Sequence, residues 1–229
     1  SKRRRLEGTS AVFRLPTKEV DGIRLDLVVK NCRVGEDVPL ETHTLIEFMN
    51  TEFNSPWEEF ALVMELREGR HGPPGLRMRT QHPLAIYIPP EQMQIWQSGR
   101  SRAKINRIHA RHPGLEIDIL RQHKLVYGWI PGRDILQMLT ASGMASDALT
   151  DHLETMTSKV NGDLERKGFV VADMKPAHVI ISDEHCRAVD AIAADGGKKT
   201  PHRQAALLRD FIEQGEYAVV DYELLLRTQ

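Results

Sequence analysis

The chain alternates between short apolar runs and longer segments with helical apolar spacing. Short runs bounded by Gly, Pro or polar residues predict strands at residues 23–31, 80–88, 125–130 and 179–182, and one more that begins at Tyr217 and is closed by Asp221. Apolar positions three and four residues apart predict helices at residues 55–68, 133–139, 149–164 and 201–213. This mixture of strands and helices predicts an α+β fold.

The helix expected at residues 55–68 carries an acid on its apolar stripe. Ser55 is a good N-cap, and Gly69 stops the helix. Glu59 falls on the same face as the apolar positions of this helix. A buried acid needs a cationic partner, and Lys30, at the end of the first predicted strand, is the candidate. Glu58 is the alternative to Glu59 as the partner of Lys30. In the simplest interpretation both acids only complement the helix dipole.

Two carboxylates lie beside apolar runs in the second half of the chain. Asp173 is in a polar loop with Lys175 and His178, just before the predicted strand at 179–182. Asp221 closes the apolar run that begins at Tyr217. One carboxylate can orient an attacking hydroxyl and another can hold Mg²⁺, so this pattern is typical of a metal–phosphate site. A hairpin with surface charges would give the same residues.

The two strings around these acids resemble motifs of one enzyme superfamily. Residues 173–181, D-M-K-P-A-H-V-I-I, are similar to the catalytic loop of protein-kinase-like phosphotransferases. Residues 219–225, V-V-D-Y-E-L-L, are similar to their metal-binding Asp-Phe-Gly segment, in the Asp-Phe-Glu form of aminoglycoside and small-molecule kinases. The resemblance implies an antiparallel-sheet N-lobe over residues 1–127 and a partial, mainly helical C-lobe over 128–229.

The resemblance also implies roles for these residues in transfer of the γ-phosphoryl group of ATP to a protein or small-molecule hydroxyl. Asp173 and Lys175 would be catalytic, and Asp221 and His178 would bind the metal, Mg²⁺ or Mn²⁺. Lys30, held by Glu59, would contact the nucleotide phosphates.

Two further nucleotide contacts follow from the same resemblance. Gly8, Thr9 and Ser10 would cover the phosphates, because a backbone without side chains can approach them closely. The stretch Y-G-W-I-P-G at residues 127–132 resembles the hinge between kinase lobes, where Gly128 and Ile130 would bind the adenine. An ordinary turn at each place is the alternative.

The chain departs from the family pattern at several points. His178 stands where the family has a metal-binding Asn, and imidazole suits softer divalent ions better than Mg²⁺. Val171 replaces the usual catalytic-loop His, and the chain ends soon after Asp221, which implies a truncated or atypical member. A nucleotide-binding pseudokinase, acting as a regulatory module, is therefore the alternative function.

Composition narrows the class of partner and the compartment. The net charge of -1 gives no overall attraction to nucleic acid or membrane, and the two cysteines fit neither a metal motif nor a disulfide framework. We expect a cytoplasmic protein with no membrane partner. The basic segment 99–113 could bind nucleic acid, but it has no interleaved aromatic residues, so a solvated helix or loop face is preferred. Residues 183–213 resemble an insertion, with a mobile loop at 191–200 and a helix after it.

Overall fold

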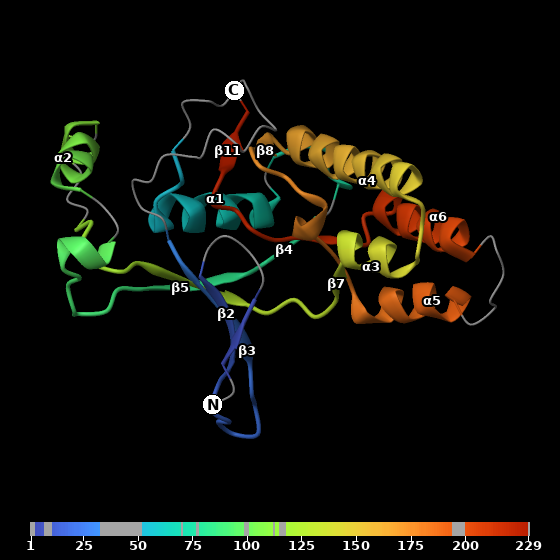
Figure 1. Cartoon of the computed structure of the whole chain (residues 1–229), viewed down its shortest axis with the longest axis horizontal. Coiled ribbons are helices and arrows are strands. Elements are labelled where there is room, and N and C mark those ends of the chain that lie inside the picture. Colours follow the sequence, from blue (N-terminus) through green and yellow to red (C-terminus); the bar gives the residue numbers. More distant parts are fainter. Residues whose placement is uncertain are drawn as a thin grey trace. The chain divides into compact units, whose positions relative to one another are not determined.

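The structure, a computed structural model, describes residues 3–6, 11–32, 52–69, 71–76, 78–98, 101–111, 113–114, 118–193 and 200–228. Figure 1 shows these residues coloured along the sequence. They fall into two units. Unit 1 holds the described parts of Ser1–Leu40, Met49–Ala61 and Pro83–Trp129. Unit 2 holds the described parts of Leu62–His82 and Ile130–Gln229. Each unit is considered by itself below.

Unit 1 is built on a five-stranded antiparallel sheet. Its strands are β1 (Arg4–Arg5), β2 (Val12–Pro16), β3 (Asp26–Asn31), β5 (Pro83–Tyr87) and β6 (Lys124–Gly128). Their order across the sheet is β1-β2-β3-β6-β5. The predicted strand at 23–31 is therefore confirmed as β3, which lies in the centre of the sheet. Its residue Lys30 is opposite Leu125 of β6.

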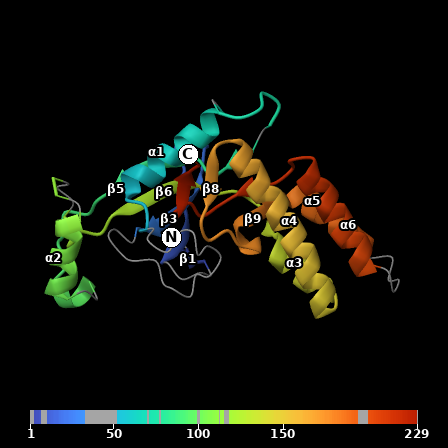
Figure 2. The same cartoon turned by 90° about the horizontal axis from the view of Figure 1, so that it is seen from above.

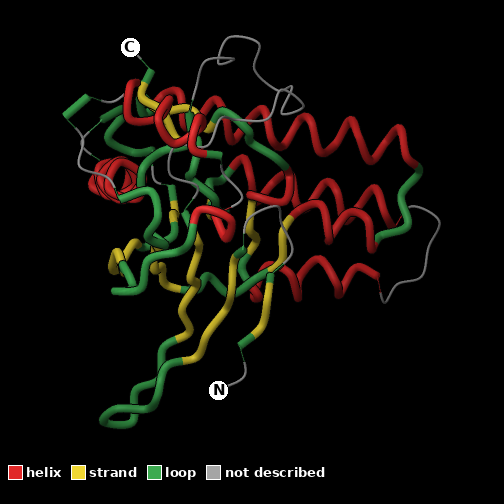
Figure 3. The backbone as a smooth tube through the Cα atoms, turned by 60° about the vertical axis from the view of Figure 1, so that its left-hand side comes forward, coloured by secondary structure: helices red, strands yellow, loops and turns green. Residues whose placement is uncertain are grey.

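A hairpin connects β2 to β3, with Asp21 and Gly22 at its turn. Both residues have positive φ, 52° and 75°, and Val20 bridges Ile23 across the turn. Asp-Gly is the preferred pair for such a turn because both central residues must adopt left-handed backbone angles. Figure 3 shows the two strands running out to this turn.

Helix α1 (Pro56–Glu68) has the N-terminus that its sequence predicts. The Glu58 N–H donates to Ser55 Oγ at 3.2 Å, and the Ser55 N–H donates to the Glu58 carboxylate at 2.9 Å. This reciprocal capping box satisfies two backbone donors at the helix start. Glu58 is therefore engaged at the cap, and Glu59 points into the buried side of the helix, with 1% of its surface exposed.

The basic segment forms helix α2 (Arg102–Arg111), which follows the short 3-10 helix η2 (Ile95–Ser98). None of the side chains of α2 is buried. Arg111 forms an ion pair with Glu52 at 2.5 Å. The expectation of a solvated helix face is confirmed for these residues.

Unit 2 contains two small sheets. The first has the order β4-β10-β9-β7, and the second pairs β11 with β8. Their strands are β4 (Arg79–Thr80), β7 (Arg133–Asp134), β8 (Phe169–Val171), β9 (Val179–Ile181), β10 (Ala218–Val219) and β11 (Leu225–Arg227). All pairs are antiparallel except the β10–β4 pair. The apolar strand that was predicted to be closed by Asp221 is present as β10, and residues 220–224 between β10 and β11 form a loop.

Four helices pack together in unit 2 (Figure 2). They are α3 (Ile135–Ala141), α4 (Ser146–Arg166), α5 (Asp183–Ala193) and α6 (Thr200–Glu213). The predicted stripe on α4 is confirmed at Leu153, Met156, Val160 and Leu164, which are all buried. The N-terminus of α3 is capped by the Asp134 carboxylate, which accepts from the Gln137 N–H at 2.8 Å.

The segment at 183–213 belongs to the core of unit 2. The expected loop at 191–200 is wrong at its start, because α5 continues to Ala193; residues 194–199 are outside the described ranges. Ser182 starts this helix, since its hydroxyl accepts from the His185 N–H at 3.3 Å. Apolar residues of α5 and α6 are buried, among them Val189 and Leu208.

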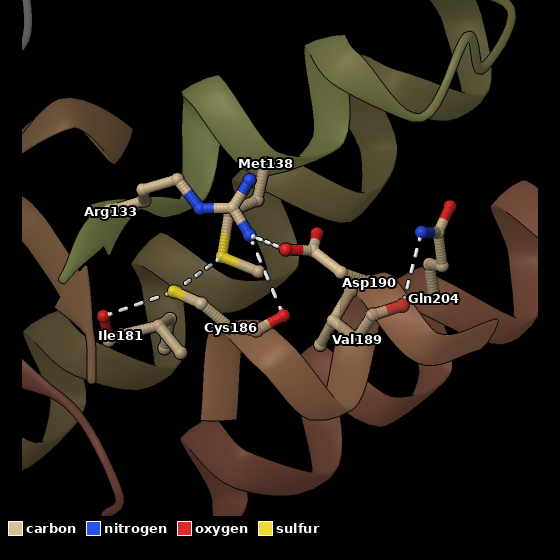
Figure 4. Close-up of polar contacts among 7 residues, drawn as sticks. All are labelled: Arg133, Met138, Ile181, Cys186, Val189, Asp190 and Gln204. Carbon is tan, nitrogen blue, oxygen red and sulfur yellow. Dashed lines mark hydrogen bonds and ion pairs between the residues drawn. The ribbon is translucent and has the colours of Figure 1, made fainter. Parts of the chain in front are cut away.

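Polar contacts tie α5 to its neighbours (Figure 4). Arg133 forms an ion pair with Asp190 at 2.6 Å, and Gln204 donates to the carbonyl of Val189 at 3.1 Å. The Cys186 thiol lies 3.5 Å from Met138 Sδ and donates to the Ile181 carbonyl at 3.3 Å. Cys186 is therefore a buried structural thiol.

The described residues confirm the coarse fold class. They contain an antiparallel sheet and six α-helices, as an α+β fold requires. The kinase-like two-lobed arrangement and the division between residues 127 and 128 stay predictions.

Candidate functional site

Two antiparallel strand pairs in unit 2 bring the loops of Asp173 and Asp221 together. Val171 of β8 pairs with Leu225 of β11, and Val179 of β9 pairs with Val219 of β10. The loops 172–178 and 220–224 are therefore held face to face at both ends. Two backbone hydrogen bonds of 2.9 Å continue the pairing into the loops, from Ala172 N–H to the Leu224 carbonyl and from Val220 N–H to the His178 carbonyl.

Asp173 is a buried carboxylate with one oxygen engaged. Only 6% of the residue is exposed. Its Oδ2 accepts a hydrogen bond from Lys175 Nζ at 3.2 Å, while the Lys175 side chain is about half exposed. The other oxygen, Oδ1, is buried and has no hydrogen-bond partner among the described residues. Such a group loses its hydration without compensation, so it is suited to accept a hydrogen bond from a ligand.

His178 and Asp221 face each other across the two loops. His178 Nε2 lies 3.7 Å from Asp221 Oδ2, which is too long for a hydrogen bond. His178 is buried in the short 3-10 helix η3 (Pro176–His178), whereas the Asp221 side chain is 34% exposed. The second ring nitrogen of His178, Nδ1, is also buried without a partner in the described part of the chain.

The backbone of Asp221 adopts an uncommon conformation. Its φ is 66°, and Asp21 is the other residue besides glycine with positive φ among those the structure describes. The left-handed region is unfavourable for residues with a Cβ atom, although Asp tolerates it better than most. Asp21 is explained by its hairpin turn. At Asp221 no glycine follows, and backbone conformations of this uncommon kind cluster at functional positions.

The donor set fits a divalent cation. Metal–nitrogen and metal–oxygen bonds are about 2.0–2.2 Å long. Two donors 3.7 Å apart can therefore reach one ion, because two such bonds together exceed that separation. No group of three or more His, Cys, Asp or Glu is arranged for a metal in the described ranges. Two protein ligands are enough for an ion that completes its coordination with phosphates and water.

A buried carboxylate in α4 that was not predicted from the sequence stabilises unit 2. Asp163 is 2% exposed and accepts hydrogen bonds from Lys159, Arg166 and the Tyr217 hydroxyl, at 2.6, 2.8 and 2.7 Å. Burial, reinforced by the hydrogen bond to Asp163, raises the pKa of Tyr217 well above its usual value. The signal in the sequence is an acid between Val160 and Leu164 on the apolar side of the helix.

In unit 1, Lys30 pairs with Glu59. Lys30 Nζ lies 3.1 Å from Glu59 Oε1 and 3.5 Å from Oε2, and both residues are buried. The structure thus selects Glu59 over Glu58, which caps α1. Tyr127 was not predicted as a site residue, and its hydroxyl donates to Glu59 Oε1 at 2.6 Å. A Tyr on the buried face of a strand needs a polar partner, and that is the signal that could have revealed it.

The remaining predicted site residues are placed as follows. Gly128 ends β6 in unit 1, and Ile130 is the first residue of a segment of unit 2. Their predicted contact with adenine is untested. Gly8, Thr9 and Ser10 lie outside the described residues, so the predicted phosphate loop stays a prediction.

The glycine of the predicted hinge motif has a clear structural reason. Gly132 has a φ of 146°, and a Cβ atom placed on it would lie 2.0 Å from the carbonyl oxygen of Ile181. Only glycine fits this close backbone approach. Gly132 is thus explained by the packing of β7 and β9 within unit 2.

None of the helices in the described residues combines the length and the continuous apolar character that a membrane span requires.

Comparisons with known proteins give no family assignment. No protein-family model matches the chain, and no curated protein sequence gives a significant match.

Proposed function

We propose that the chain is an ATP-dependent phosphotransferase of the kinase-like class, which transfers the γ-phosphoryl group to a hydroxyl of a protein or small molecule. One observation carries the proposal. Asp173 Oδ1 and His178 Nδ1 are buried polar atoms without partners in the described residues, and both lie in the loop that is hydrogen-bonded to the loop of Asp221. Unpaired buried polar atoms at one place in a fold favour a ligand-binding site over a structural turn.

The proposed chemistry assigns a role to each group. Asp173 orients the acceptor hydroxyl and takes its proton as the oxygen–phosphorus bond forms and the bond from Pγ to the bridging oxygen of ADP breaks. Lys175 lies next to this carboxylate and places a positive charge near the transferred phosphoryl group. Positioning and charge neutralisation are the main sources of rate enhancement in phosphoryl transfer.

Asp221 and His178 would hold the divalent cation. When bound, the cation would neutralise the charge of the β- and γ-phosphates. The donor set of one imidazole and one carboxylate favours Mn²⁺ over Mg²⁺, because Mg²⁺ prefers oxygen ligands.

Unit 1 contributes a second element in support of the proposal. The resemblance assigns the nucleotide phosphates to Lys30, and the buried ion pair with Glu59 fixes the position of this ammonium group. An amine group held by a carboxylate has a defined position, and phosphate binding by a lysine depends on where this compact group lies. The nucleotide-base contacts of Gly128 and Ile130 are part of the same proposal.

The alternative proposal is a nucleotide-binding pseudokinase. Two features favour it: the Lys175 ammonium occupies one oxygen of Asp173, and His178 is a weak ligand for Mg²⁺. Such a protein would bind nucleotide without transferring phosphate and would act as a regulatory module.

Nucleotide binding and transfer, measured on matched variants, separate these proposals. Titration calorimetry with ATP in the presence of Mn²⁺ or Mg²⁺ should show binding by the wild type and by Asp173→Asn. Transfer, followed by the formation of ADP with a panel of acceptors, should fall by about 100-fold to 10,000-fold in Asp173→Asn. Binding without transfer in the wild type would favour the pseudokinase. Transfer that is unchanged in Asp173→Asn would refute the catalytic assignment.

A further inference from the structure

Tyr127 shares an oxygen atom with Lys30. The Tyr127 hydroxyl donates to Glu59 Oε1 at 2.6 Å, and the same oxygen lies 3.1 Å from Lys30 Nζ. The three residues come from β6, α1 and β3, and each is at most 4% exposed. A single carboxylate oxygen therefore joins a buried phenol to a buried ammonium.

The register of the sheet explains this arrangement. Val28 of β3 is directly opposite Tyr127 of β6, and Lys30 is opposite Leu125. Directly opposed residues share a face of a sheet, and so do residues two apart on one strand. Lys30 and Tyr127 are therefore diagonal neighbours on the same face. Glu59 comes from α1 and reaches both side chains.

The hydroxyl has a specific effect on the carboxylate. Burial removes water from Glu59, and a hydrogen bond to an ionised carboxylate is among the stronger ones in proteins. A short bond to Oε1 also restricts rotation of the carboxylate group. The lysine side chain has four flexible carbons, so the position of its ammonium group depends on the acid that it contacts.

We propose that Tyr127 is a positioning residue, which holds the Glu59 carboxylate in one orientation and thereby fixes the Lys30 ammonium. The consequence for nucleotide affinity rests on the proposed function, in which Lys30 binds the phosphates. A cation that is already in place before the ligand arrives binds it more tightly, because no side-chain ordering is needed on binding. The positioning of Lys30 itself can be tested without a nucleotide.

The first test measures the reactivity of Lys30 in the free protein. An amine-reactive ester is added to the folded chain, and mass spectrometry gives the acylation rate at Lys30. Tyr127→Phe removes the hydroxyl and keeps the ring, so the rate at Lys30 should rise by about threefold to tenfold, as loss of one hydrogen bond to a charged group implies.

Tyr217→Phe is the matched control. Tyr217 is also a buried Tyr that donates to a buried carboxylate, that of Asp163 in unit 2. This variant should leave the rate at Lys30 at the wild-type value. An unchanged rate in Tyr127→Phe, or an equal rise in both variants, would overturn the positioning role, since the second result would mean general loosening of the fold.

The second test measures ATP affinity. Tyr127→Phe should raise the Kd by about tenfold relative to wild type, while Tyr217→Phe should not change it. If Lys30 becomes more reactive and the Kd stays the same, the link to nucleotide binding is refuted. A wild type that binds no ATP refutes the proposed function, and the labelling experiment still decides whether Tyr127 positions Lys30.

Discussion

His178 Nε2 and Asp221 Oδ2 lie 3.7 Å apart although the two residues come from different strand connections of unit 2. The backbone bond from Val220 to the His178 carbonyl keeps the two loops together. Asp221 has a left-handed φ of 66°, and its carboxylate lies near the ring. This pair is the part of the proposed site whose chemistry differs from an all-oxygen magnesium site.

Replacement of His178 by Asn tests the metal preference. An amide oxygen suits Mg²⁺ better than an imidazole nitrogen does. We expect His178→Asn to bind Mg²⁺ more tightly and Mn²⁺ less tightly than the wild type, each by about tenfold. Calorimetric titration with each metal in the presence of a fixed ATP concentration measures both constants. Equal metal affinities in the wild type and the variant would show that His178 is not a ligand.

Loss of the Tyr217 hydroxyl should weaken unit 2. Tyr217→Phe removes a hydrogen bond to a buried carboxylate, so the free energy of unfolding should fall by about 1.5–3 kcal/mol. Chemical denaturation by urea measures this difference at pH 7.

The Tyr217 pair also predicts a dependence on alkaline pH. Burial raises the pKa of Tyr217 in the folded protein, so its contribution is complete below the unfolded value of 10.0 and is lost as the pH rises through the folded pKa. The wild type should therefore lose more stability above pH 10 than Tyr217→Phe does. Parallel curves for the two proteins would contradict a buried neutral phenol at this position.

An alanine at position 132 should destabilise the packing of β7 on β9. The added Cβ atom would clash with the carbonyl oxygen of Ile181, and the φ of 146° is unfavourable for any residue other than glycine. Gly132→Ala should lower the free energy of unfolding by at least about 1–3 kcal/mol. Gly162→Ala, in α4 with no atom near the new Cβ, is the control and should be neutral or stabilising. Equal stabilities of the two variants would argue against the close approach.

Acid stability should depend on Arg227. Its hydrogen bond to Glu65 is the main cause that lowers the pKa of this carboxyl, with a smaller contribution from His71. A lowered folded pKa gives stability that is present above the unfolded value of 4.5 and is lost as the pH falls through the folded pKa. Arg227→Gln should make this acid-induced loss of stability slightly smaller. The difference is small because the ion pair is largely exposed and an exposed pair contributes little. Urea unfolding at pH 6 and at pH 3 measures it, and equal pH dependences would exclude the linkage.

Local sequence signals predicted several elements well. Ser55, Pro56 and Gly69 define the ends of α1, and the stripe of α4 is continuous enough to identify its buried side. The Lys30–Glu59 pair was predicted because Glu59 lies on the apolar face of its helix, where a buried acid needs a cationic partner. These features depend on residues close together in the sequence, where spacing alone decides which side chains share a face.

Contacts between distant segments could not be predicted in the same way. The short strands β10 and β11 and the loop between them depend on pairing with β9 and β8. Tyr127 meets Glu59 only because β6 lies beside β3 in the sheet. Helix α5 had a local signal, Ser182 before two acids, but the small residues that follow it suggested a loop.

Thermal unfolding with ATP and each metal tests the central claim most directly. ATP with Mn²⁺ at about 100 times the Kd should stabilise the wild type by about 2.7 kcal/mol and raise the Tm by several degrees. The shift should be smaller with Mg²⁺, and it should be lost in Asp221→Ala. If neither metal gives a shift, or if Asp221→Ala shifts as much as the wild type, the proposed nucleotide–metal site at Asp173, His178 and Asp221 is wrong.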